Sequence, residues 1–194
     1  MVQIEDYCRA RDVRELWAVA EPTSWLSPYW ADLHFAKCNN LVTMEADVED
    51  VQRRMVATNR TYQLVPGNAE LLDGIVTIDH NAFTAPWQYS AAMVTSLMVD
   101  DSDITVCQDH GQPAGYCAVL KKRDGVHLTR IAVAPEFVRR GVASVLIASV
   151  CDHLHGRSHI TLNTPADALP AMRLYRKLGF VAVPEKLSVF RCAF

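Results

Sequence analysis

Two kinds of apolar patterning follow one another along this chain of 194 residues. In the first 58 residues, apolar positions recur at helical spacing in two pieces, about residues 13–20 and 48–58, with a turn-rich stretch between them. From residue 62 onward, short apolar runs of strand length alternate with longer helical stretches. We therefore expect a helical N-terminal extension over residues 1–58 and an α/β domain over residues 59–194.

Three strand-like runs stand close together in the middle of the chain, over residues 104–108, 114–120 and 127–133. Turn-forming residues separate them, so they predict an antiparallel meander. A helix over residues 139–155 and a strand over residues 159–164 come next and predict a βαβ crossover. The expected fold is α/β of the α+β kind, with a mixed, mostly antiparallel central sheet flanked by helices.

The segment between the third strand and the long helix is rich in small and basic residues. Gly141 and Ala143 leave room for a ligand to approach the backbone, and the first amides of the following helix have no partner within that helix. Arg139 and Arg140 add positive charge at the same place. These features predict a pyrophosphate cradle. The candidate cofactor-binding residues are Ile131, Ala132, Val133, Val138, Arg139, Arg140, Gly141, Val142, Ala143 and Ser144.

A second informative block follows one strand later. Residues 173–180 read Arg-Leu-Tyr-Arg-Lys-Leu-Gly-Phe, which predicts a helix that ends at Gly179. Phe180 then leads into two short strands expected over residues 181–183 and 187–193. A cradle followed by such a helix is far less common than either block alone.

Together the two blocks resemble the GCN5-related N-acetyltransferase superfamily, from about residue 64 to the C-terminus. The family pattern at the acetyl-CoA site is Gln/Arg-x-x-Gly-x-Gly/Ala, and the late helix often reads Leu-Tyr-x-x-x-Gly-Phe. Val138 stands where the family usually has Gln or Arg, and Ala168 stands where many members have Asn. The resemblance implies acetyl-CoA as the cofactor, with its pantetheine arm on the backbone of residues 131–133, where two parallel strands splay apart.

The resemblance also implies residues for the chemistry. Tyr175 matches a tyrosine that in many relatives acts as general acid toward the departing sulfur. On ordinary pKa values this proton transfer runs uphill by roughly 2 kcal/mol, so a hydrogen bond to the sulfur is the alternative. His127 stands where many histone-type members carry a glutamate, and an imidazole can accept a proton from an ammonium directly or through water. A surface histidine is the alternative for His127, and Asp79 and His80 are weaker candidates for the base.

Residues 83–87, Phe-Thr-Ala-Pro-Trp, are similar to the Phe-x-x-Pro-Trp segment of ribosomal-protein alanine acetyltransferases. In those enzymes the loop between the first two helices contacts the acceptor peptide. Phe83, Pro86 and Trp87 are therefore candidate substrate-binding residues. A Pro-Trp pair that only packs two helices together is the alternative.

The charge of the chain is unevenly distributed although the net value is only −3. Residues 1–50 carry ten acidic and four basic side chains, whereas residues 121–194 carry five acidic and twelve basic ones. The basic third contains the cradle, which suits a polyanionic cofactor, and the acidic remainder suits a cationic amine acceptor. The small net charge gives no sign of a nucleic-acid partner.

Composition also narrows the setting in which the protein works. No apolar run approaches the ~20 residues of a membrane span, and the N-terminus lacks a signal-peptide core, so we expect a cytoplasmic protein without a membrane partner. The six cysteines form no Cys-x-x-Cys pair and are expected to be reduced. No metal site is expected, because four neighbouring side chains with ligand chemistry do not converge on one face: Cys151, His153, His155 and His159.

Three of the four tryptophans lie in the N-terminal extension: Trp17, Trp25 and Trp30. Clustered aromatic side chains can form a substrate lid or a subunit interface, so a homodimer is one alternative. Packing of the extension onto the core is the favoured interpretation.

The leading hypothesis is an acetyl-CoA-dependent N-acetyltransferase that works by direct attack of an amine. The acceptor is a protein or peptide amine, or a small-molecule amine, because short motifs do not describe the loops that set acceptor specificity. Two alternatives remain. One is a non-catalytic acyl-CoA-binding or regulatory module with the same fold, and the other is an ordinary α/β interaction domain in which the two blocks coincide by chance.

Overall fold

The computed structural model describes residues 2–21, 24, 25, 27–55, 61–99, 102–152, 154 and 158–194. The chain divides into two compact units. Unit 1 comprises Met1–Met44, Asn163–Arg173 and Ala182–Phe194, and unit 2 comprises Glu45–Leu162 and Leu174–Val181.

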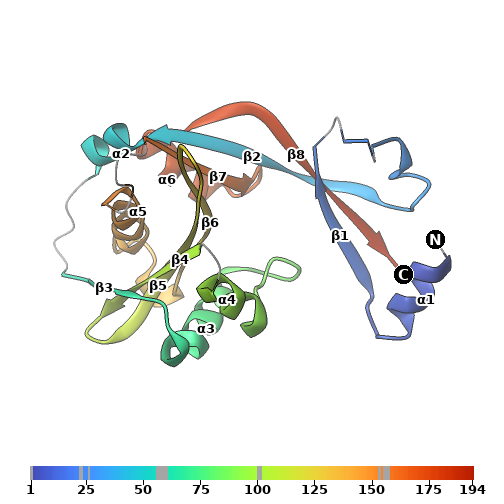
Figure 1. The fold of residues 1–194 in the computed structure, drawn as a ribbon, viewed down its shortest axis with the longest axis horizontal. Helices are drawn as coiled ribbons and strands as arrows, with labels where there is room; N and C mark the ends of the chain where they lie inside the picture. The colour runs from blue at the N-terminus through green and yellow to red at the C-terminus, as the bar shows by residue number, and fades with distance from the viewer. Residues whose placement is uncertain are drawn as a thin grey trace. The chain divides into compact units, whose positions relative to one another are not determined.

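The sheet of unit 2 contains the meander that the sequence predicts. Its strands lie in the order β7-β6-β5-β4-β3, with antiparallel pairing throughout except for the parallel pair β6 and β7. The helix α5 (Val142–Asp152) connects those two parallel strands, which confirms the predicted βαβ crossover (Figure 1). The strands are β3 (Gln63–Pro66), β4 (Ser102–Asp109), β5 (Gln112–Lys121), β6 (Gly125–Val133) and β7 (His159–Pro165).

Helices cover both faces of this sheet. On one face, α3 (Leu72–Ala82) packs on β5 and β6, and α4 (Ala91–Val99) packs on β4; α5 packs on the other face (Figure 1). Coverage on both sides explains why β5 is buried at six successive positions, 114–119, instead of alternating. The fold is thus the predicted α/β class, a mostly antiparallel sheet flanked by helices.

The strand β6 contains a β-bulge in its middle. Ala118 of β5 pairs with Arg130, whereas the next residue, Val119, pairs with Leu128, so Thr129 is the extra residue. The Thr129 hydroxyl donates to the Ala118 carbonyl oxygen at 2.9 Å. On the other edge of β6, the parallel ladder with β7 ends at the pair Leu128↔Leu162, while β6 itself continues to Val133. The bulge and the end of the ladder therefore coincide.

The bulge also decides which side chains of β6 share a face. Leu120 pairs with His127 and Ala118 pairs with Arg130, and residues 118 and 120 lie on the same face of β5. Directly opposed residues point to the same side of a sheet, so His127 and Arg130 lie on the face that α3 covers. Without the extra residue they would point to opposite faces.

Unit 1 is not the helical extension that the sequence predicts. Residues 15–20 form a strand, β1 (Glu15–Ala20), that pairs antiparallel with β8 (Val181–Ala193), so the helix expected over residues 13–20 is wrong. A run of this length fits either periodicity, and a ladder to a distant strand decides between them. The long strand β2 (Ala36–Asp47) and the helix α1 (Val2–Arg9) were not predicted either. A short 3₁₀ turn, η1 (Ser27–Tyr29), lies between β1 and β2 in the chain.

The three tryptophans of unit 1 differ in their surroundings. Trp30 is buried, stacked on Phe190 with ring centroids 4.7 Å apart, and it meets the edge of Phe35. Trp25 is 77% exposed, and the indole of Trp17 donates to Glu15 at 2.8 Å on the surface. Trp30 therefore packs within unit 1, on Phe35 and Phe190.

Several element boundaries also differ from those expected. The helix predicted from residue 139 begins only at Val142, because Arg139 and Gly141 adopt positive φ angles of 62° and 91°. Its predicted end falls on residues 153 and 155, outside the described residues. The helix predicted over residues 48–58 is α2 (Val48–Arg54), and residues 56–58 are also outside them. The two expected C-terminal strands form the single strand β8, whereas the late helix is α6 (Leu169–Lys177) as predicted.

All six cysteines are free thiols, and only Cys38 is exposed. Within the part of the chain that the structure describes, no helix is both long and apolar enough to cross a membrane.

We expect Gly115→Ala to lower the free energy of unfolding by about 1–3 kcal/mol. A Cβ atom at this position would lie 2.7 Å from the Ala132 carbonyl oxygen and 2.7 Å from Val142 Cγ1, so β5 would have to move away from β6 and α5. Chemical denaturation measures the change. Gly74→Ala is the matched control, since its Cβ would meet only Pro113 side-chain atoms, the nearest at 3.3 Å, and alanine favours the helix. Equal stabilities of the two variants would contradict the expectation.

Candidate active site

The predicted cradle is a loop of unusual backbone conformation between β6 and α5. A 3₁₀ turn, η3 (Pro135–Phe137), is followed by the exposed Val138, and then by Arg139 and Gly141 with positive φ. These two positive φ angles place an exposed turn directly before the N-terminus of α5 (Val142–Asp152), and helix N-termini bind anions. Phe137, 5% exposed, anchors the loop in the core.

The N-terminus of α5 supplies further donors to this loop. The first bond within the helix runs from the Val145 amide to the Gly141 carbonyl at 3.0 Å, so the amides of Val142, Ala143 and Ser144 precede the helical ladder. Arg139 and Arg140 are exposed beside them. The carbonyl of Arg140 accepts a hydrogen bond from the Tyr62 hydroxyl at 2.9 Å, which fixes the loop from a second segment of chain. Small residues, free amides and two cations fit a pyrophosphate group.

The end of β6 offers backbone groups in a regular pattern. The Ala134 amide donates to the Ala114 carbonyl at 2.9 Å, so it points toward β5. Amides alternate along a strand, and the Ala132 amide therefore also points to β5, while those of Ile131 and Val133 point to the opposite edge. That edge lies beyond the end of the ladder with β7. Its amides are thus placed to bind an extended, amide-containing chain.

Tyr175 is a buried residue of α6, 6% exposed, whose ring packs on Phe180 with centroids 5.7 Å apart. Burial raises the pKa of the Tyr175 hydroxyl to about 12. The hydroxyl therefore stays protonated at neutral pH and is suited to donate a hydrogen bond. Transfer of its proton to a thiolate of ordinary pKa would cost about 5 kcal/mol, which makes it a poor acid in this state.

His127 lies next to the point where the two parallel strands stop pairing. It pairs with Thr161 of β7, and its Nδ1 lies 2.9 Å from the Thr161 hydroxyl oxygen. Burial lowers the pKa of His127 below the ordinary 6.5, and the positive charge of Lys122 lowers it further. His127 is therefore neutral at pH 7, with a lone pair on one ring nitrogen.

Asp79, named as a weaker base candidate, has a different environment. Its side chain is fully buried and accepts two bonds from Arg130, from Nε at 2.7 Å and from Nη2 at 2.8 Å. It also accepts hydrogen bonds from the Tyr116 hydroxyl and, at 2.7 Å, from the Tyr89 amide. Burial alone raises the pKa of Asp79, but the bonds it accepts outweigh burial and hold the pKa below 3.8. An ionised carboxylate with these four bonds is unsuited to accept a proton.

The other weak base candidate, His80, follows Asp79 on α3. Its Nε2 lies 2.9 Å from the Tyr89 carbonyl oxygen. A ring nitrogen that donates to a carbonyl carries a proton, so this atom is not a base in the structure.

The three candidate acceptor-binding residues lie on the loop between α3 and α4. The Phe83 ring stacks on the Arg130 guanidinium at 3.5 Å, and the Trp87 carbonyl accepts a hydrogen bond from Arg130. Pro86 is exposed between them. Arg130, Tyr89 and Thr161 were not singled out from the sequence. A lone charged residue in the strand-like run from Leu128 to Val133 is the signal that could have found the first of them.

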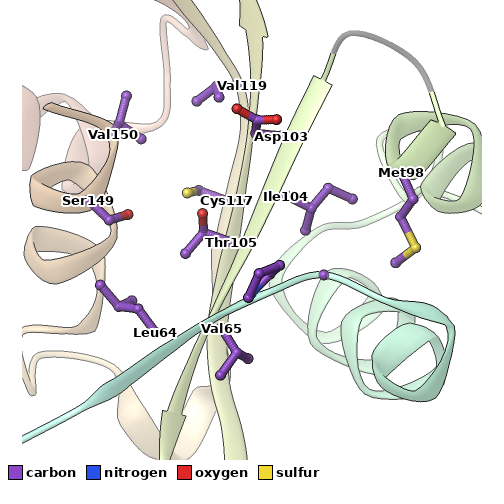
Figure 2. A pocket seen from close by; sticks show the side chains of 12 residues that line it. Leu64, Val65, Met98, Asp103, Ile104, Thr105, Cys117, Val119, Ser149 and Val150 are labelled. Atoms are coloured by element: carbon purple, nitrogen blue, oxygen red, sulfur yellow. The ribbon is translucent and has the colours of Figure 1, made fainter. Parts of the chain in front are cut away.

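A cavity of about 360 Å³ lies elsewhere in unit 2 and contains none of the predicted site residues. Figure 2 shows Leu64 and Val65 of β3, Met98 of α4, and Ser149 and Val150 of α5 around it. Its lining carries no cluster of groups for acid–base chemistry, so the candidate active site rests on β6 and the cradle. Among the described residues no group of three or more His, Cys, Asp or Glu side chains could hold a metal ion, and His153 and His155 lie outside them.

Comparisons with known proteins point to one family. The model of the acetyltransferase (GNAT) family matches residues 72–180, more than half of the chain. An uncharacterized N-acetyltransferase from Methanocaldococcus jannaschii is 28% identical over 90 residues, which cover 42% of this chain and 40% of that protein. The matched stretch thus spans two fifths of the length of this relative.

Two solved structures share the fold. A functionally unknown conserved protein from Staphylococcus epidermidis has a TM-score of 0.73 at 16% identity, covering 99% of this chain and 78% of that one. The ribosomal-protein-S18-alanine N-acetyltransferase from Escherichia coli has a TM-score of 0.59 at 19% identity, covering 69% of this chain and 94% of that one. At these identities the similarity is one of fold.

We expect the pKa of His127, followed by NMR titration of its ring protons, to lie below 6.5, and Lys122→Gln to raise it because a nearby positive charge is removed. Since the unfolded chain takes up this proton at higher pH than the folded one, the free energy of unfolding should fall as the pH drops below about 6.5. His127→Gln assigns the resonance and serves as control. A His127 pKa at or above 6.5 would show that the ring is solvated.

Proposed function

Since the chain belongs to the acetyltransferase (GNAT) family, we propose that it transfers an acetyl group from acetyl-CoA to an amine by direct attack of that amine. The observation that carries the proposal is the end of the β6–β7 ladder at Leu128↔Leu162, directly before the amides of Ile131 and Val133 and the cradle. One strand thus leads from a row of free backbone donors to an anion-binding loop. A long ligand with an amide-rich arm and a pyrophosphate has both features.

In this proposal each part of acetyl-CoA has a defined place. The amides of residues 141–144, with Arg139 and Arg140, hold the pyrophosphate, and the backbone of residues 131–133 holds the pantetheine arm. Bound there, the thioester supplies an activated acetyl group. Val138 and Ala168 give the ligand no polar side chain, but the amide donors of the loop do not depend on either side chain.

The protein then has to place a donor near the sulfur and to take up a proton from the amine. Tyr175 donates a hydrogen bond to the sulfur, since its raised pKa favours the role of donor over that of acid. His127 accepts the amine proton, directly or through water, because it is neutral at pH 7. His127 lies on the face of the sheet that α3 and the α3–α4 loop cover. The cradle lies at the start of α5, the helix that covers the opposite face.

Thr161 fixes which nitrogen of His127 accepts that proton. The Thr161 hydroxyl oxygen lies 2.9 Å from His127 Nδ1 and 3.5 Å from the Val126 carbonyl oxygen. If the hydroxyl donates to this carbonyl, Nδ1 carries the ring proton and donates to Thr161, and Nε2 keeps its lone pair. The hydroxyl therefore orients the base.

The acceptor class is the finer part of the proposal. The loop with Phe83, Pro86 and Trp87 borders the face that carries His127, and one structural neighbour is named for acetylating the alanine of a ribosomal protein. These observations favour a protein or peptide amine, with a small-molecule amine as the second class. Six free thiols suit a reducing compartment such as the cytoplasm.

A non-catalytic acyl-CoA-binding module is the second candidate function. Two observations favour it: the raised pKa of Tyr175, which makes it a poor acid, and the absence of a carboxylate at the position of His127. The two functions predict the same binding of acetyl-CoA and differ only in turnover with an amine.

Acetyl-CoA should raise the melting temperature of the protein, and Gly141→Glu should abolish the rise because it places bulk and negative charge inside the cradle. At 100 times the dissociation constant the ligand should add about 2.7 kcal/mol of stability. Gly111→Glu is the matched control: it makes the same change at another glycine of positive φ, where an added Cβ would meet no atom within 4 Å. No rise in the wild type, or an equal rise in both variants, would count against the cradle.

Tyr175→Phe should lower kcat by about 10- to 100-fold, the cost of one hydrogen bond to a developing charge, without changing the thermal shift by acetyl-CoA. Steady-state release of coenzyme A with an alanine-terminated peptide or spermidine measures the effect. An unchanged kcat would leave Tyr175 with a packing role only.

A further inference from the structure

The side chain of Arg130 joins four segments of unit 2. It forms two hydrogen bonds with Asp79 of α3, and the same carboxylate accepts the hydroxyl of Tyr116 from β5. Its guanidinium lies between the rings of Phe83 and Tyr89, at 3.5 Å and 4.0 Å from their centroids. All of these groups surround one cation that belongs to β6.

Most of these contacts go to the loop between α3 and α4. Within that loop Arg130 contacts both aromatic rings and donates to the carbonyl of Trp87, while Asp79 accepts the amide of Tyr89. Gln88 closes the loop on itself by donating to the His80 and Phe83 carbonyls at 3.0 Å and 2.9 Å. The ion pair therefore links the loop to α3 and β6 through both rings, the Trp87 carbonyl and the Tyr89 amide.

We propose that Arg130, held by Asp79, is a positioning residue that fixes the α3–α4 loop relative to the strand that carries the acetyl group, and thereby sets the binding of the acceptor amine. Arg130 directly precedes Ile131, the first residue of the proposed pantetheine site, so one strand holds both substrates in register. The inference rests on the proposed function, because it assigns the loop to the acceptor.

The charge balance of the pair suits a cationic acceptor. A lone arginine 8% exposed beside the loop would repel an ammonium group, but the Asp79 carboxylate neutralises it. The Tyr116 hydroxyl, whose pKa is raised by burial and by Asp79, remains protonated and adds a donor without adding charge. The network thus orders the loop while contributing no net charge.

Two variants separate this role from general stability. Arg130→Lys keeps the charge that Asp79 needs, but an ammonium cannot form the planar fork, stack between two rings and reach Trp87 together. The double variant Asp79→Leu/Arg130→Met removes both charges and leaves no buried ion unpaired, which favours folding. Lys121→Met is the control, because it deletes a cation from the neighbouring strand whose partner is Asp103, remote in sequence from the loop.

The full-length variants are compared by three measurements: thermal shift with acetyl-CoA, deuterium uptake over residues 83–90, and steady-state kinetics with an alanine-terminated peptide and spermidine. In both variants we expect an unchanged thermal shift with acetyl-CoA and a higher deuterium uptake over residues 83–90. We also expect KM for the better amine to increase by at least about tenfold, because a displaced loop misplaces the amine. Lys121→Met should match the wild type in all three.

The possible outcomes test the positioning role of Arg130 and the proposed catalytic function separately. Raised deuterium uptake with unchanged KM and kcat would overturn the positioning role, and so would uptake that stays at the wild-type level. The same rise in KM and in deuterium uptake in the Lys121→Met control would also overturn it. Absence of turnover in the wild type with every amine would contradict the proposed catalytic function itself, and the assignment of the loop to an acceptor with it.

Discussion

A single buried carboxylate connects α3, β5, β6 and the α3–α4 loop. Asp79 is fully buried, and all four of its hydrogen bonds come from elements distant in the sequence or from the loop that follows α3. Such a charge is tolerated in a protein interior only when its partners are in place. Correct packing of α3 on β5 and β6 is therefore also correct placement of the loop, since the same interaction requires both.

In the proposed function, the donor site and the acceptor site use opposite electrostatic means. On the donor side the protein exposes cations and unpaired amides, because the expected ligand is a polyanion held at the surface. On the acceptor side it buries an equal number of positive and negative charges and presents aromatic rings and carbonyls. A neutral His127 lies between these regions in the sequence and adds no charge to either.

The sequence predicted the meander, the βαβ crossover and the late helix, because these elements have strong local periodicity and clear turn residues. It failed where pairing with distant strands decides: β1 is a short run that fits either helix or strand, and the long strand β2 was not predicted at all. Within the candidate site, the sequence indicated the cradle through its small residues, because glycine permits backbone conformations that other residues rarely adopt. The contacts of Asp79 with Tyr116 and Arg130 were not predicted, because a contact across more than thirty residues follows no short sequence spacing.

The bulge at Thr129 affects the stability of the sheet. Each further pair between two parallel strands would add backbone hydrogen bonds and cover apolar surface, so a regular β6 would gain stability by continuing its ladder past Leu128. The extra residue forgoes that gain and leaves amides uncommitted within a well-packed sheet. In β6, backbone donors are therefore open to a ligand only because the strand forms fewer hydrogen bonds within the sheet than a regular ladder would.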